Sequence, residues 1–189
     1  VWLDMPELNI DVLLSAPQKG WSATPCAALV MLSERGRERV ESTQSTSFAC
    51  DLRKWLEVMS AYERGGHMYH ATLPTDALAQ LRDALVESRR SSLSTLRNAQ
   101  WQLGQRIRAT LEGAGFASVA AEGFKAPSVV VSYTQDADVA SGKKLRDLGL
   151  QVAAGIPLAC DEPASFRTFR VGLFGLDKLL NIDRTVRTF

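Results

Sequence analysis

The sequence lacks an excess of charge of either sign, because 22 Lys and Arg residues stand against 21 Asp and Glu and the formal net charge is +1. Without a basic excess there is no electrostatic case for binding nucleic acid or an anionic membrane surface. The sequence also lacks an apolar run long enough to cross a bilayer, and its first residues do not have the pattern of a signal peptide. We therefore expect neither nucleic acid nor a membrane among its partners.

Cysteine and histidine are scarce. The three cysteines, Cys26, Cys50 and Cys160, are odd in number and widely spaced, so they form neither a disulfide framework nor a metal motif. His67 and His70 lie three residues apart, but no third ligand is nearby, and we expect no metal site. This cysteine usage favours a reducing, cytoplasmic setting. The chain also has no initiator methionine and opens close to a strand-like run, which suggests a piece of a longer protein.

The composition is that of a globular protein, with 46% hydrophobic and 23% charged residues. Apolar spacing predicts strands separated by helices, a rhythm that indicates an α/β layered fold. We expect strands at 10–15, 27–32, 129–131, 151–154 and 169–174, and helices at 34–40, 51–64, 75–85, 96–111, 139–148 and 176–186. The helices at 75–85 and 96–111 can join into one long, bent helix.

One lysine stands in an unusual local context. Lys19 follows the strand-like run 10–15, is bracketed by Pro17 and Gly20, and precedes a second apolar run at 27–32. A lysine beside a glycine is ordinarily a solvated surface residue. Between two buried strands, however, its amine would be desolvated, and desolvation favours the neutral form that can attack an aldehyde.

Three separated motifs carry a resemblance to a known family. Residues 15–25 contain Ser-Ala-Pro-Gln-Lys-Gly-Trp followed by Thr-Pro, residues 68–74 read Met-Tyr-His-Ala-Thr-Leu-Pro, and residues 169–175 read Phe-Arg-Val-Gly-Leu-Phe-Gly. In this order they resemble the class V pyridoxal-phosphate-dependent aminotransferases, in particular the alanine–glyoxylate and serine–pyruvate enzymes. Each motif is weak alone, but the ordered set is specific and spans most of the chain.

The resemblance implies the C-terminal half of a fold-type-I transferase that depends on pyridoxal 5'-phosphate. Residues 1–90 would be the C-terminal part of the large coenzyme-binding domain, and 91–189 the small C-terminal α/β domain. The activity implied is transfer of an amino group from an α-amino acid to a 2-oxo acid such as glyoxylate or pyruvate, by a ping-pong mechanism.

The resemblance also implies a role for five residues. Lys19 would bind the coenzyme as a Schiff base and shuttle the proton, with Gln18 beside the coenzyme phosphate. Tyr69 and Thr72 would supply hydroxyls to the phosphate of the partner subunit's site, so the protein would be a homodimer with shared active sites. Arg170 would bind the substrate α-carboxylate, since a planar carboxylate suits the two-pronged guanidinium.

Other interpretations remain open. Cys160 lies in a loop before the arginine strand, as does the nucleophile of cysteine desulfurases, so a desulfurase or lyase is an alternative. A second alternative is an inactive fragment that serves only as a dimerising domain. Arg170, flanked by apolar residues, could also be neutralised by a structural salt bridge instead of a substrate.

Overall fold

The computed structural model describes residues 3–189, and within them the chain divides into two compact units. The N-terminal unit comprises residues 3–18 and Ala23–Asp83, and the C-terminal unit comprises Lys19–Ser22 and Ala84–Phe189. Residues 1 and 2, with which the expected large-domain segment opens, lie outside the described part. The main boundary falls within helix α3 (Thr75–Arg90), and the short turn that carries Lys19 groups with the C-terminal unit.

The N-terminal unit begins with a two-stranded antiparallel sheet. Strand β1 (Val12–Ser15) pairs with β2 (Leu29–Leu32), so that Val12 lies opposite Leu32. Both strands were predicted, but the expectation that they are buried is wrong. Side chains of β1 alternate between exposed and half-buried, and all four of β2 are half-buried. The reason is that each strand has a single neighbour, and a lone hairpin cannot enclose its own side chains.

Helix α1 (Glu34–Glu41) begins where the sequence predicts, at a serine cap. The hydroxyl oxygen of Ser33 accepts a hydrogen bond from the backbone N–H of Gly36 at 3.0 Å. Gly36 allows a close approach, because a Cβ atom there would lie 2.5 Å from the carbonyl oxygen of Asp11. The helix therefore packs directly against the backbone that leads into β1.

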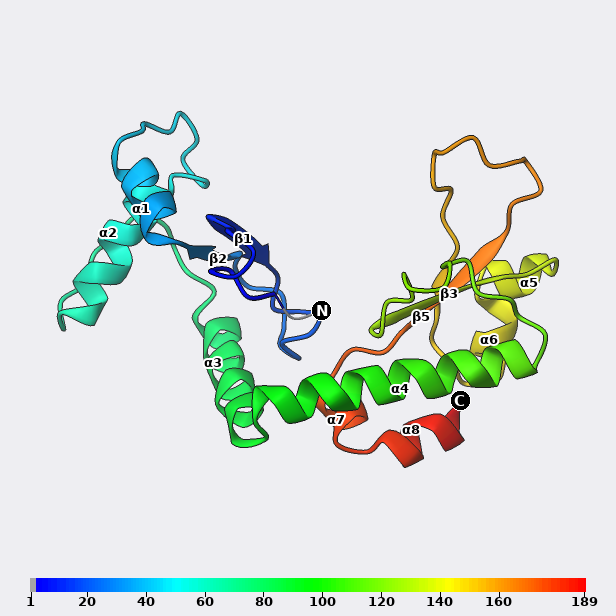
Figure 1. Cartoon of the computed structure of the whole chain (residues 1–189). Helices are drawn as coiled ribbons and strands as arrows, with labels where there is room; N and C mark the ends of the chain where they lie inside the picture. Colours follow the sequence, from blue (N-terminus) through cyan, green and yellow to red (C-terminus); the bar gives the residue numbers. More distant parts are fainter. Residues whose placement is uncertain (1–2) are drawn as a thin grey trace. The chain divides into compact units, whose positions relative to one another are not determined.

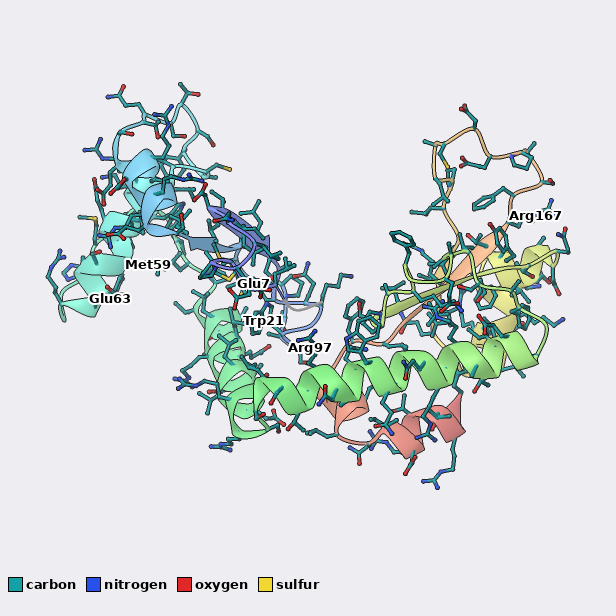
Figure 2. The ribbon with its side chains drawn as sticks, viewed as in Figure 1. Glu7, Trp21, Met59, Glu63, Arg97 and Arg167 are labelled. Atoms are coloured by element: carbon teal, nitrogen blue, oxygen red, sulfur yellow. The ribbon has the colours of Figure 1, made fainter. Side chains whose placement is uncertain are left out.

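Helix α2 (Leu52–Glu63) also begins after a capping side chain. The carboxylate of Asp51 accepts from the backbone N–H of Lys54 at 3.0 Å, and Gly65, with φ +77°, follows the end of the helix. The helix buries little of its apolar surface, and Met59 is 58% exposed (Figure 2).

The possibility of one long helix across 75–111 is wrong. Helix α3 ends at Arg90, and a separate helix, α4 (Leu93–Gly113), begins at Leu93, so Ser91 and Ser92 lie between them. Ser92 breaks the helical path, since its φ is +60°, and its hydroxyl oxygen then accepts from the N–H of Thr95 at 3.3 Å. A residue in the left-handed region cannot continue a right-handed helix.

The core of the C-terminal unit lies between α4 and a three-stranded antiparallel sheet. The strands are β3 (Val129–Tyr133), β4 (Ala153–Ala154) and β5 (Thr168–Gly172), and β5 lies in the middle. Helix α4 contacts β3 and also lies along the last two helices of the chain (Figure 1). The strand signals of the sequence are thus confirmed, although β4 is shorter than predicted.

This core is formed by side chains that α4 presents every three or four residues, as its apolar spacing predicts. Leu103 and Ile107 are completely buried, and Phe169 of β5 lies edge-on to Phe116 with ring centroids 5.2 Å apart. The buried cluster comprises Leu103, Ile107, Leu111, Val130, Val139, Phe169, Val171 and Leu173.

Two predicted helices are each divided in the structure. The predicted helix 139–148 overlaps the end of α5 (Ala137–Ala140) and contains α6 (Lys143–Asp147), and the two are separated at Gly142, whose φ is +75°. The closing segment contains α7 (Leu176–Leu179) and α8 (Ile182–Thr188). In the part of the chain that the structure describes, no helix has the length and apolar content needed to cross a bilayer.

Candidate active site

Lys19 lies in a tight turn. The N–H of Ser22 donates to the carbonyl oxygen of Lys19 at 3.1 Å, and the N–H of Ala23 donates to that of Pro17 at 3.1 Å. The expectation that Lys19 is desolvated between buried strands is wrong for the described residues, because its side chain is exposed and the flanking hairpin is open. Its ammonium nitrogen lies 5.7 Å from the centroid of the Phe174 ring. Gln18, the preceding residue, is also exposed.

Tyr69 and Thr72 lie together in the loop between α2 and α3. Their hydroxyl oxygens are 3.4 Å apart, and Tyr69 is 78% exposed, so both groups are available to a ligand from outside this unit. Both residues belong to the N-terminal unit, as does Gln18, whereas Lys19 and Arg170 belong to the C-terminal unit.

His70, between these two residues, anchors their loop. Its ring packs on Phe48 with centroids 4.2 Å apart and meets the Trp55 ring edge-on at 5.1 Å, and its Nε2 lies 3.1 Å from the carbonyl oxygen of Phe48. This packing turns His70 inward and leaves Tyr69 facing solvent. Among the described residues no group of His, Cys, Asp or Glu could hold a metal ion.

Arg170 stands in the central strand β5 between two buried side chains, Phe169 and Val171, which are 1% and 6% exposed. Its Nε donates to the carbonyl oxygen of Ala154 at 2.9 Å. Within residues 3–189 its two terminal nitrogens make no hydrogen bond, and no carboxylate pairs with the guanidinium. The backbone contact orients the side chain and leaves its two-pronged end without a protein partner.

A second arginine in the same unit shows what a structural guanidinium looks like here. Arg108 of α4 is only 6% exposed, and its two terminal nitrogens donate to the hydroxyl of Ser118 at 2.7 Å and to the carbonyl oxygen of Ala126 at 3.0 Å. Both ends of Arg108 are therefore used within the fold, whereas those of Arg170 are not.

The loop between β4 and β5 is organised by Glu162. Its carboxylate accepts hydrogen bonds from three backbone amides, at 2.8 Å from Cys160, at 3.0 Å from Ala159 and also from Leu158. Backbone hydrogen bonds, that of Cys160 first, lower the pKa of Glu162 to about 2. Cys160 is exposed. Arg167, labelled in Figure 2, is one of the residues that line a hollow of about 590 Å³ beside this loop.

This architecture is that of a known fold. The chain has the mixed α/β structure of the C-terminal portion of fold-type-I pyridoxal-phosphate-dependent transferases, as the three motifs predicted. It superposes over 100% of its length on 49% of an alanine–glyoxylate aminotransferase from Nostoc sp., with a TM-score of 0.79 at 19% identity. A ureidoglycine–glyoxylate aminotransferase from Bacillus subtilis matches 98% of the chain over 48% of its own, with a TM-score of 0.75 at 20% identity.

The particular relatives found by sequence agree. The chain is 26% identical over 183 residues to the alanine–glyoxylate aminotransferase of Callithrix jacchus, a match that covers 92% of this chain and 42% of that protein. The chain thus spans about half the length of the relatives it matches. No family model matches the sequence.

A more distant structural match bears on the coenzyme. A serine palmitoyltransferase variant from S. paucimobilis, solved with a bound pyridoxal phosphate–myriocin aldimine, matches 95% of this chain over 39% of its own, with a TM-score of 0.56 at 17% identity. The fold of this chain is therefore one that occurs in enzymes that hold this coenzyme.

Sequence reasoning missed three residues that shape the candidate site. His70 belongs to the second motif and was considered as a metal ligand, but its packing on Phe48 and Trp55 was not predicted. Phe174 lies in the third motif, four residues after Arg170, but no spacing rule connects it to Lys19. Ser22 had no signal in the sequence, because its partner is 154 residues away.

Proposed function

We propose that this chain is the C-terminal half of a pyridoxal-phosphate-dependent transaminase, which moves an amino group from an α-amino acid to a 2-oxo acid by a ping-pong mechanism. The fold match over the whole chain and the sequence match to an alanine–glyoxylate aminotransferase support this activity. The names of the relatives favour glyoxylate, or a small 2-oxo acid such as pyruvate, as acceptor. The scarce, free cysteines favour a cytoplasmic setting.

The chemistry of the available donors fits the coenzyme. Lys19 offers a primary amine that is exposed and, within residues 3–189, bound in no ion pair, as covalent attachment of an aldehyde requires. Tyr69 and Thr72 offer two adjacent hydroxyls, which suit a phosphate oxygen. When bound, the coenzyme itself supplies the electron sink that stabilises the substrate carbanion. Lys19 would hold the coenzyme and move the proton at its amine, and Gln18 would lie beside the phosphate.

The observation that carries the proposal is the unpartnered end of Arg170. The guanidinium of Arg170 is half-buried, and within the described residues its two terminal nitrogens meet no acceptor, so they are available to pair with an anion. A substrate α-carboxylate would complete this pairing through two parallel hydrogen bonds. A structural salt bridge, the competing explanation, has no carboxylate partner within residues 3–189.

The exposed pair Tyr69 and Thr72 supports the further proposal of a homodimer with shared active sites. Hydroxyls that face away from their own unit can contact a coenzyme bound by a second copy, as the class V resemblance implies. We also propose that residues 1–90 belong to the large coenzyme-binding domain and 91–189 to the small domain, a division close to the boundary between the two compact units.

Arg170→Lys tests the function in the full-length protein, with Arg108→Lys as the matched control. Arg170→Lys keeps the charge and loses the two-pronged geometry, so kcat/KM should fall by about ten- to two-hundred-fold, from about 1.5–3 kcal/mol for a charge-assisted bond. Its melting temperature should change little. Arg108→Lys should lower the melting temperature and leave kcat/KM per folded molecule unchanged, because Arg108 bonds only to the fold.

Steady-state kinetics and melting curves on both variants decide the matter. If Arg170→Lys unfolds the protein while kcat/KM per folded molecule stays at the wild-type value, Arg170 is part of the scaffold and the proposed substrate site is wrong.

A further inference from the structure

The turn that carries Lys19 is held by the C-terminal unit. The hydroxyl oxygen of Ser22 accepts a hydrogen bond from the backbone N–H of Leu176 at 2.9 Å. Leu176 is the first residue of α7, and Gly175, which precedes it, has no side chain that could cap the helix. Ser22 therefore serves as the cap of a helix 154 residues away.

A second contact links the same turn to the same segment. The Lys19 ammonium nitrogen lies 5.7 Å from the centroid of the Phe174 ring, within the range of a cation–π interaction. Phe174 is two residues before Leu176 and four after Arg170, so both ends of the Lys19–Ser22 turn contact one short stretch of chain.

The receiving stretch is itself fixed to the core. Leu173, 2% exposed, donates its N–H to the carbonyl oxygen of Ser128 at 2.9 Å. The buried side-chain amide of Gln100 donates to the carbonyl oxygens of Leu173 at 3.3 Å and of Pro127 at 3.0 Å. Because helix α4 carries Gln100, the backbone under Phe174 is bound on two sides.

We propose that Ser22 and Phe174 are positioning residues: they fix the position of the Lys19 amine relative to β5, the strand that carries Arg170. This inference rests on the proposed function and adds to it a means of holding the turn that carries the amine against the backbone segment that follows the carboxylate-binding Arg170. Fixing the amine in this way would favour a high rate of transfer, since a small displacement of a reacting group lowers the rate by a large factor.

The closing experiment uses the full-length protein loaded with pyridoxal phosphate, and Ser22→Ala with Ser92→Ala as a matched pair. Both serines have φ +60°, and each hydroxyl caps a helix of the C-terminal unit. Ser22→Ala should lower kcat about ten-fold with KM within about two-fold. It should also move the pH midpoint of the coenzyme's visible absorption by about half a unit, because the environment of the attached amine changes. Ser92→Ala should lower the melting temperature and leave both readouts at wild-type values.

A conservative variant and a coenzyme-free measurement separate positioning from folding. Ser22→Asn keeps an acceptor oxygen and suits the left-handed backbone, so it should restore most of kcat and the absorption midpoint. In coenzyme-free protein, Phe174→Leu should raise the acetylation rate of Lys19 about two- to five-fold relative to Lys144, since the ring no longer stabilises the ammonium.

Three results would overturn the proposal, each for a different part of it. Equal losses of melting temperature in Ser22→Ala and Ser92→Ala, with kcat and the absorption midpoint at wild-type values in both, would show that Ser22 only caps α7. An unchanged acetylation rate in Phe174→Leu overturns the role of the ring. Coenzyme attached in the wild type to a lysine other than Lys19 overturns the proposed function and this inference with it.

Discussion

The two compact units differ in how much of their apolar surface they enclose. The C-terminal unit has a continuous buried cluster between α4 and the sheet, in which Leu103, Ile107 and Val130 are 0% exposed. Apolar side chains buried in the N-terminal unit include Pro17, Val58, Ala61 and Leu81. Large apolar side chains that the N-terminal unit exposes include Leu3, Leu8, Val12, Leu14, Phe48, Met59, Tyr62, Met68 and Tyr69.

This difference bears on where substitutions should affect stability. The C-terminal unit carries its own core and holds Lys19 and Arg170 on elements attached to that core. The N-terminal unit carries Gln18, Tyr69 and Thr72 on exposed segments. We infer that the single substitutions that most reduce the free energy of unfolding lie in the C-terminal unit, since burial is the main source of stability.

The largest expected effect contrasts a core side chain with an exposed one in the 189-residue chain. Phe169→Ala removes a ring that is 1% exposed and should lower the free energy of unfolding by about 3–5 kcal/mol. Leu14→Ala, at a side chain that is 68% exposed, should lower it by less than about 0.5 kcal/mol. Urea unfolding of both variants measures the contrast, and equal losses would remove the distinction between the units.

A smaller effect is expected at two glycines where helices approach backbone. A Cβ on Gly104 would lie 2.4 Å from the carbonyl oxygen of Pro127, and one on Gly36 would lie 2.5 Å from that of Asp11. Gly104→Ala should destabilise by about 1–3 kcal/mol, because Pro127 is also bound by buried Gln100 and cannot yield.

Gly36→Ala should cost about 1–2 kcal/mol, because a Cβ there would meet a single backbone atom under 3.0 Å, the carbonyl oxygen of Asp11, whereas one at Gly104 would meet three of Pro127, and because alanine favours the helix. Thermal melts of the two variants test this order, and a larger loss at Gly36 would contradict the idea that the N-terminal unit is the more yielding one.

The smallest expected effect concerns two carboxylates. The guanidinium of Arg35, and then the hydroxyl of Ser33, lower the pKa of Asp11 in the N-terminal unit. Backbone amides, that of Cys160 first, lower the pKa of Glu162 to about 2 in the C-terminal unit. Since both folded-state pKa values are depressed, the stabilisation is present above the ordinary pKa values of 3.8 and 4.5 and is lost as pH falls through the folded-state pKa.

Salt distinguishes the two carboxylates. In about 1 M salt the pKa of Asp11 should rise toward its ordinary value, because its partner is an exposed guanidinium, whereas that of Glu162 should stay near 2. NMR titration of both carboxyl carbons at low and high salt measures this, and a salt-dependent Glu162 would contradict its attribution to backbone amides.

The local signals of the sequence predicted much of this structure. Ser33 and Asp51 mark helix starts through their own side chains, and the spacing of Leu103, Ile107 and Leu111 gives the buried face of α4. The break at Ser92 was left open and that at Asn181 was missed, because neither residue is an obligatory helix breaker.

Part of the candidate site could likewise be predicted from the sequence and part could not. The motifs around Lys19, Tyr69 and Arg170 are contiguous in sequence, so a resemblance could name them. The caps and ring contacts that position them join distant segments, as between Ser22 and Leu176, and no local pattern specifies such pairs. The exposure of Lys19 was also out of reach, since it depends on what covers the hairpin and not on the loop itself.

The central claim is that Lys19 holds the coenzyme. Borohydride reduction of the full-length protein loaded with pyridoxal phosphate fixes the coenzyme to whichever lysine it occupies, and peptide mapping identifies that lysine. Lys143 and Lys144 are internal controls, because each is exposed and forms an ion pair with an aspartate. We predict the modified peptide to contain Lys19 and the peptides of both controls to be unmodified. Coenzyme on Lys143 or Lys144, with Lys19 free, would contradict the account.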